Sequence, residues 1–131
     1  MTTTRSSVPN WIVYYLGFVS IVSAIFAIIV YADASVVWSD WAAIDAPGAT
    51  DVGGPAGLFA ARNIATAAMG AYALYHRSQP MMELLLVFRI VVDLLDGVHG
   101  VISCTPQVIA IGFLAATIEM IMYRRLRAAR T

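Results

Sequence analysis

Lysine is absent from this 131-residue chain, and arginine supplies all eight basic charges. Eight acidic residues balance them, so the formal net charge is zero and the charge predicts no nucleic-acid partner. The single cysteine, Cys104, excludes an internal disulfide and dithiol redox chemistry within one chain. With only two histidines, we expect no metal site, and no motif indicates a cofactor.

Charged residues make up only 12% of the chain, and hydrophobic residues make up 60%. This composition is typical of a membrane protein, and the length leaves room for one domain, residues 1–131. Ala32-Asp33-Ala34 resembles a signal-peptide cleavage site. The apolar run from Trp11 to Tyr31 is, however, longer than the usual signal core of roughly 7–15 residues, so we interpret it as a retained membrane span.

Four apolar segments have the length and pattern of membrane-spanning helices. They cover approximately residues 11–31, 56–75, 81–102 and 107–123. The sequence therefore predicts an all-α integral membrane protein, built as an antiparallel four-helix transmembrane bundle. Small residues favour close helix contact, at Gly17, Ser20, Ala24 and Ala27 in the first span and at Gly97 and Gly100 in the third. Pro106 is expected as the first helical residue of the fourth span.

The arginines outside the spans lie in the N-terminal segment, the second loop and the C-terminal tail. The first and third loops carry none. Because cytoplasmic loops are enriched in basic residues, both termini are expected in the cytoplasm. The predicted location is the plasma membrane or another cell membrane, with the lipid bilayer as the main partner, and a homodimer is left open.

The third predicted span is unusual because it carries a polar stripe. Arg89, Asp93 and Asp96 are spaced so that they share one helix face. Each charge near the centre of a membrane helix costs about 2.5–3.5 kcal/mol on insertion scales. Such residues are tolerated only where they face other protein or a wet cavity, so the remaining spans are expected to enclose this stripe.

The predicted catalytic site collects polar side chains from three spans: Arg62, Asn63, Arg89, Asp93, Asp96 and Glu119. The helix rise of about 1.5 Å per residue places them in two layers. The layer nearer the outer face joins Arg62 and Asn63 with the two aspartates, and the deeper layer joins Arg89 with Glu119. Because three carboxyl groups face two arginines in this set, we expect one carboxyl to carry a proton near neutral pH. That is the condition for a general acid.

Other residues allow more than one interpretation. Most aromatic residues near the predicted span ends are expected to form interfacial belts: Tyr14, Tyr15, Tyr31, Trp38 and Trp41. Three of these, together with His99, are candidate substrate-binding residues: Tyr14, Trp38 and Trp41. Asp96 and His99 have the spacing of a metal-ligand pair, but the only other histidine, His76, is expected on the opposite side of the membrane. His99 is therefore expected to cap or line the outer mouth of the bundle.

The second and third predicted spans carry a recognisable pattern. It comprises the run GLFAARN at residues 57–63, Gly70, the pair Phe88-Arg89, and Asp93 with Asp96-Gly97. This pattern resembles the DoxX-like short four-span membrane proteins, in particular the domain-of-unknown-function 4267 group. The resemblance implies a four-span fold over most of the chain. Some small membrane proteins of this general kind occur in biosynthetic pathways for lipophilic natural products, where epoxide opening or cyclisation is assigned to them.

Three functions are compatible with buried charges of this kind. In the first, the protein is an enzyme acting on a lipophilic small molecule, because an Asp–Arg–Asp group resembles the site of limonene-type epoxide hydrolases. Asp93 and Asp96 would then serve as acid and base, Arg62 or Arg89 would bridge them, and Asn63 would help hold water, while an isomerase or cyclase would need no water. In the second, the carboxyl groups serve a small proton-coupled transporter. In the third, the charges only lock the helices of an accessory subunit together.

Overall fold

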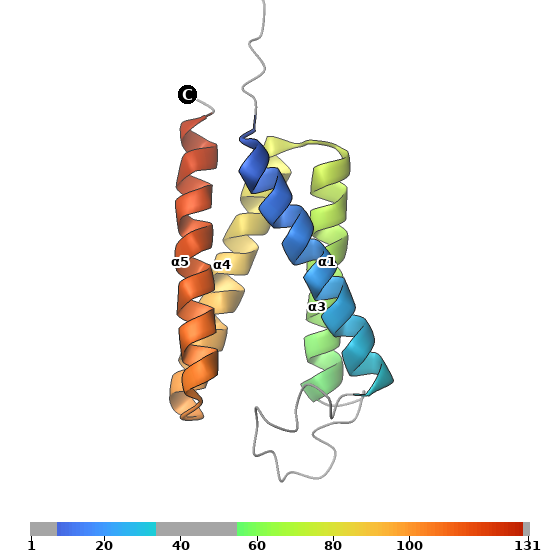
Figure 1. Ribbon diagram of the computed structural model, residues 1–131, viewed down its shortest axis with the longest axis vertical. Helices are drawn as coiled ribbons and strands as arrows, with labels where there is room; N and C mark the ends of the chain where they lie inside the picture. The colour runs from blue at the N-terminus through green and yellow to red at the C-terminus, as the bar shows by residue number, and fades with distance from the viewer. Residues whose placement is uncertain (1–7, 34–54, 130–131) are drawn as a thin grey trace, which may run out of the picture. The chain divides into compact units, whose positions relative to one another are not determined.

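The computed structural model describes residues 8–33 and 55–129, which are helical apart from short turns and ends. The helices are α1 (Asn10–Ala32), α3 (Pro55–Tyr75), α4 (Gln79–Ile102) and α5 (Pro106–Ala128), as Figure 1 shows. The all-α class is thus confirmed, and each predicted span coincides with one helix. The largest difference is at the end of α5, which continues five residues beyond the predicted Tyr123.

The turns that precede α4 and α5 follow one pattern. α4 has a proline in its first turn, and α5 begins on Pro106 as predicted, because a proline lacks only an N–H that the first turn leaves unpaired. In each turn one non-glycine residue adopts a positive φ, 47° at Arg77 and 54° at Cys104. Around Cys104 the amide of Thr105 donates to the carbonyl of Gly100 at 2.9 Å, which closes the end of α4.

The described helices belong to two compact units. One contains the chain up to Leu16 together with everything from Ala73 onwards, and the other runs from Gly17 to Tyr72. In the first unit α4 and α5 lie side by side and run in opposite directions (Figure 1). The amide side chain of Gln79, at the start of α4, donates to the carbonyl of Leu126 near the end of α5 at 2.7 Å. This bond ties together the helix ends that lie far from the connecting turn.

Glycine sets how closely α4 and α5 approach. A Cβ atom added at Gly112 would lie 2.6 Å from the backbone nitrogen of Gly97, and one added at Gly100 would lie 2.7 Å from that of Ile109. These distances are too short for any side chain, so the two backbones are in direct contact here. The prediction that Gly97 and Gly100 permit helix contact is confirmed.

The second unit contains the later part of α1 and most of α3. Val30 of α1 packs with Ala56 and Ala60 of α3, and Phe59 lies against this cluster. Of the small residues predicted to form a contact seam on α1, Ser20 and Ala27 are buried, and Gly17 and Ala24 are half-buried. Small side chains therefore do occupy the packed face of α1.

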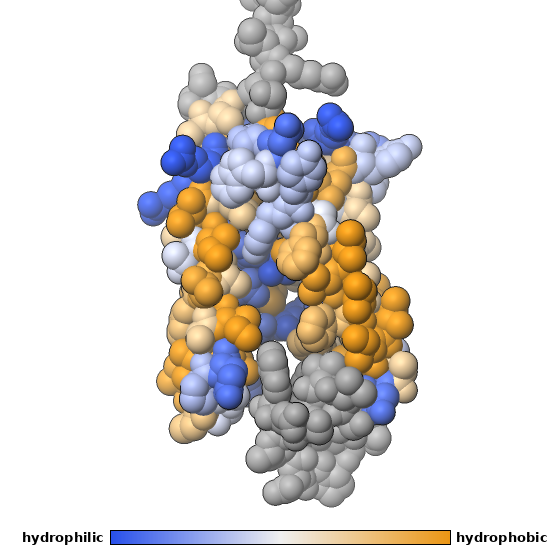
Figure 2. Space-filling model, in the orientation of Figure 1, coloured by the Kyte–Doolittle hydropathy of each residue, from blue (hydrophilic) through white to orange (hydrophobic). Residues whose placement is uncertain are grey.

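Two of the described helices, α1 and α5, are long and apolar enough to cross a membrane. Both expose large hydrophobic side chains, including Phe18 and Ile28 on α1 and Leu114 and Ile121 on α5. Figure 2 shows hydrophobic residues over much of the visible surface of the described helices. α4 carries too many charged residues to pass the same composition test, and the polar stripe of its sequence is the reason.

Candidate functional site

Glu119 of α5 is the most buried ionisable side chain in the described part of the first unit, with an exposed fraction of 0%. It occupies a position that the helical repeat assigns to the core, since Gly112, Ala116, Met122 and Leu126 of α5 are also buried. One carboxylate oxygen, Oε1, accepts a hydrogen bond from the hydroxyl of Tyr15 at 3.0 Å. The same oxygen accepts a hydrogen bond from the Nε of Arg89.

Arg89 lies between two carboxylates. Its Nε contacts Glu119, and its terminal nitrogen Nη2 lies 3.2 Å from Oδ2 of Asp93, one turn further along α4. The side chains of Arg89 and Asp93 are only 15% and 13% exposed, so the bridge is mostly shielded from solvent. The pairing of Arg89 with Glu119, which helix depth predicts, is confirmed. We refer to Tyr15, Arg89, Asp93 and Glu119 as the Glu119 cluster.

The second oxygen of Glu119, Oε2, is buried, and no donor among the described residues lies within hydrogen-bond distance of it. Buried polar atoms usually have a partner, because leaving one unsatisfied costs roughly 1–3 kcal/mol or more for a charged group. The cluster also holds two carboxyl groups for one arginine. Oε2 is therefore the atom of the cluster that remains open to a proton or a ligand.

The role of Tyr15 differs from the prediction. The sequence places it in an aromatic belt, whereas the structure directs its hydroxyl to Glu119. The prediction was wrong because a tyrosine near a helix end suits both roles. The helical repeat holds a signal for the correct one, since Tyr15 lies beside the buried Ile12 and Leu16. Tyr14, next to it in sequence, is 73% exposed and is compatible with a belt position.

The other residues predicted for the site lie in several places. Asp96 is half-buried and His99 is exposed, both further along α4 than Asp93. Arg62 and Asn63 are half-buried on α3 in the other unit, so their pairing with the aspartates stays a prediction. The predicted substrate-binding residues Trp38 and Trp41, which were also proposed for the interfacial belts, lie outside the described residues.

On α3, both polar predicted residues engage Phe59. The amide nitrogen of Asn63 donates to the backbone carbonyl of Phe59 at 2.9 Å. The guanidinium carbon of Arg62 lies 5.1 Å from the centre of the Phe59 ring, which is a cation–π distance. The proposed water-holding role of Asn63 would therefore use its carbonyl oxygen, because its amide nitrogen already serves the helix.

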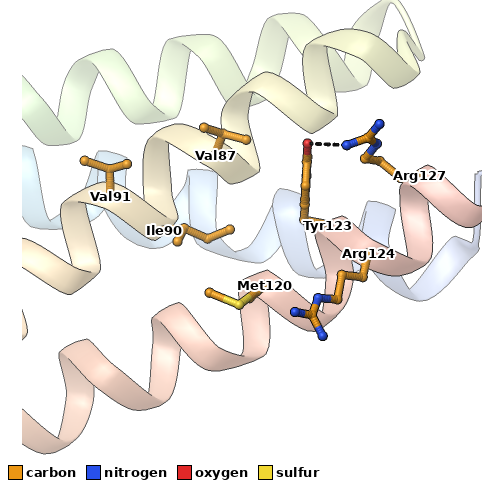
Figure 3. Close-up of a pocket in the computed structure, with 7 residues that line it drawn as sticks. All are labelled: Val87, Ile90, Val91, Met120, Tyr123, Arg124 and Arg127. Atoms are coloured by element: carbon orange, nitrogen blue, oxygen red, sulfur yellow. Dashed lines mark hydrogen bonds between the residues drawn. The ribbon is translucent and has the colours of Figure 1, made fainter.

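A groove runs along α4 and α5 in the first unit, with a volume of about 530 Å³ (Figure 3). Seven residues line it: Val87, Ile90, Val91, Met120, Tyr123, Arg124 and Arg127. None of the seven belongs to the Glu119 cluster. The substrate pocket expected around Asp93 and Asp96 is thus a separate feature from this groove and stays a prediction.

Within residues 8–33 and 55–129, no three histidine, cysteine, aspartate or glutamate side chains come together in a way that could hold a metal ion. The chemistry available in the Glu119 cluster is therefore that of carboxyl, guanidinium and phenol groups. No family model matches the chain, and neither a curated protein nor a solved structure matches it. The resemblance to the DoxX-like proteins accordingly stays a prediction.

Proposed function

We propose that this protein is an integral membrane enzyme that uses acid/base chemistry on a small lipophilic substrate, with epoxide hydrolysis as the leading reaction. The apolar lengths of α1 and α5 and their exposed hydrophobic side chains support a membrane location. Isolated apolar residues are normal on soluble proteins, but surfaces rich in them usually face lipid or another protein.

In the proposed arrangement all four helices cross the bilayer as an antiparallel bundle, with both termini in the cytoplasm. The arginines of the N-terminal segment, the second loop and the C-terminal tail support this orientation. The pairing of Arg89 with Asp93 and Glu119 supports the inclusion of α4, because charges inside a bilayer are tolerated when they pair with one another.

The observation that carries the proposed chemistry is the position of Arg89 between Asp93 and Glu119. Opening an epoxide with water needs an acid for the ring oxygen and a base for the water, and a shared arginine holds both in place. Glu119 would donate a proton from Oε2 to the epoxide oxygen as the C–O bond breaks. Asp93 would take a proton from the water whose oxygen forms the new C–O bond. The product is a diol, and proton return from Asp93 to Glu119 resets the site.

The experiment is to incubate the purified protein, in lipid nanodiscs, with a panel of terpene epoxides in ¹⁸O-labelled water. The proposal predicts diol formation with one labelled oxygen, and loss of at least about 100-fold in rate for Asp93→Asn, because a positioned acid or base contributes about 10²–10⁴-fold. Glu83→Gln is the matched control, since this carboxylate of α4 bonds to Gln79 instead of the cluster. Equal rates for the two variants, or rearranged products without label, would reject the hydrolase.

A proton-coupled carrier is the second candidate, and the continuous contacts from Tyr15 through Glu119 and Arg89 to Asp93 favour it. Chains of ionisable groups inside membranes serve proton relays as well as catalysis. Reconstituted vesicles with an imposed pH gradient separate the two functions. A carrier acidifies or alkalinises the lumen only when its solute is present, whereas an enzyme forms product in detergent without any gradient.

A further inference from the structure

The groove between α4 and α5 changes character along its length. On α5 its lining residues are Met120, Tyr123, Arg124 and Arg127, a spacing that keeps them on one helix face. With a helix rise of about 1.5 Å per residue, this stripe passes from a thioether to two guanidinium groups within about 10 Å. We call this lined surface the α4–α5 groove.

The facing wall, on α4, is entirely apolar. Val87, Ile90 and Val91 recur at helical spacing and line the groove opposite the α5 stripe, as Figure 3 shows. No acidic residue is among the seven that line it. One end of the groove is therefore hydrophobic, and the other end is cationic without a neutralising carboxylate in its lining.

The aromatic residue of the groove holds one of its arginines in place. The guanidinium carbon of Arg127 lies 5.9 Å from the centre of the Tyr123 ring, and a terminal nitrogen of Arg127 donates to the Tyr123 hydroxyl at 3.5 Å (Figure 3). A guanidinium that rests on an aromatic ring keeps further N–H groups available for an anion. Arg124, three residues earlier and exposed, offers a second set of donors on the same face.

We propose that the α4–α5 groove binds one anionic glycerophospholipid. The phosphate lies between Arg124 and Arg127, and an acyl chain follows Val87, Val91 and Met120. Arginine pairs bind phosphate through charge-assisted hydrogen bonds, and basic pockets beside membrane helices bind anionic headgroups. A free phosphate would leave the apolar wall without a partner, and a zwitterionic headgroup would bring a second positive charge towards the two arginines. The site rests on the proposed membrane location but is independent of the Glu119 cluster.

The test is native mass spectrometry of the full chain, delipidated in detergent and titrated with dioleoyl phosphatidylglycerol or dioleoyl phosphatidylcholine. The proposal predicts tighter binding of phosphatidylglycerol. Because each arginine near an anionic headgroup contributes about fivefold, the double variant Arg124→Gln/Arg127→Gln should weaken phosphatidylglycerol binding by about 30-fold. Arg125→Gln is the matched control, because this arginine occupies the same turn of α5 but does not line the groove.

A second variant tests the apolar wall. Val91→Trp fills the groove while both arginines remain, and should also weaken phosphatidylglycerol binding, whereas Leu95→Trp, one turn away and outside the lining, should not. Equal binding of the two lipids, equal loss in Arg125→Gln and the double variant, or displacement of the lipid by equimolar inorganic phosphate would each overturn the proposal. Epoxide turnover measured on the same samples separates this result from the enzyme proposal, since lipid binding can fail while turnover persists.

Discussion

Tyr15 donates a hydrogen bond of 3.0 Å to Glu119, and so joins the first turns of α1 to the middle of α5 across 104 positions of sequence. Within the described residues, this bond and the contact with Arg89 provide the polar partners of a fully buried carboxyl group. Because buried polar groups need partners, the bond both orients Glu119 and fixes the start of α1 against the α4–α5 pair.

Removing the Tyr15 hydroxyl should therefore weaken the fold. Tyr15→Phe keeps the ring and deletes one hydrogen bond to a buried carboxyl, so we expect a loss of about 1.5–3 kcal/mol in the free energy of unfolding. Thermal or denaturant unfolding in detergent measures it. Tyr14→Phe is the control and should be neutral, since Tyr14 is mostly exposed; equal losses in both variants would contradict the assigned role of Tyr15.

The Arg89–Glu119 pair should be more damaging to halve than to remove. Breaking a buried ion pair by losing one partner costs about 3–5 kcal/mol, whereas replacing both partners with apolar residues of similar size is often neutral or stabilising. We expect Arg89→Met and Glu119→Met each to destabilise strongly, and the double variant to recover most of the loss. Unfolding in detergent of all three variants and the wild type gives the double-mutant cycle. Simple addition of the two single losses would contradict the account.

A methyl group at Gly112 should force the α4 and α5 backbones apart. Glycine to alanine in a helix normally stabilises by about 1 kcal/mol, but here the new Cβ would meet the backbone nitrogen of Gly97 at 2.6 Å. We expect Gly112→Ala to destabilise by about 1–3 kcal/mol, the usual cost of overpacking. Ala110→Gly, at an exposed position of α5, calibrates helix propensity and should cost about 1 kcal/mol. A stabilised Gly112→Ala protein would show that the helices do not touch there.

The turn at Cys104 should gain from glycine. Cys104 has φ 54°, a conformation that costs an L-residue about 1–2 kcal/mol and glycine very little. We expect Cys104→Gly to raise the free energy of unfolding by about 1 kcal/mol and Cys104→Ala to leave it nearly unchanged. Unfolding curves of the two variants, measured side by side in detergent, check this difference, and no gain from glycine would contradict the assigned turn.

The helices were predictable from sequence because each is a long apolar segment bounded by proline, glycine or charge. The Arg89–Glu119 pair was also predictable, since helix rise alone places these side chains at similar depth. Tyr15 was not, because an interfacial tyrosine and a buried hydrogen-bond donor present the same sequence pattern near a helix end. The positive φ of Arg77 and Cys104 was hidden for a similar reason, since neither residue type signals a left-handed turn. The groove beside Tyr123 depends on how two helices face each other, which no single segment encodes.

The most direct test of the central claim, that the Glu119 cluster performs acid/base chemistry, is the effect of Glu119→Gln on turnover and stability in the same preparation. Glutamine keeps the size of the side chain and an oxygen that can accept the Tyr15 bond, but it cannot donate and regain a proton as a general acid. We predict a folded protein, judged by elution volume and helical content, whose epoxide turnover falls by at least about 100-fold while Glu83→Gln retains its rate. A folded Glu119→Gln protein with wild-type turnover would contradict the account.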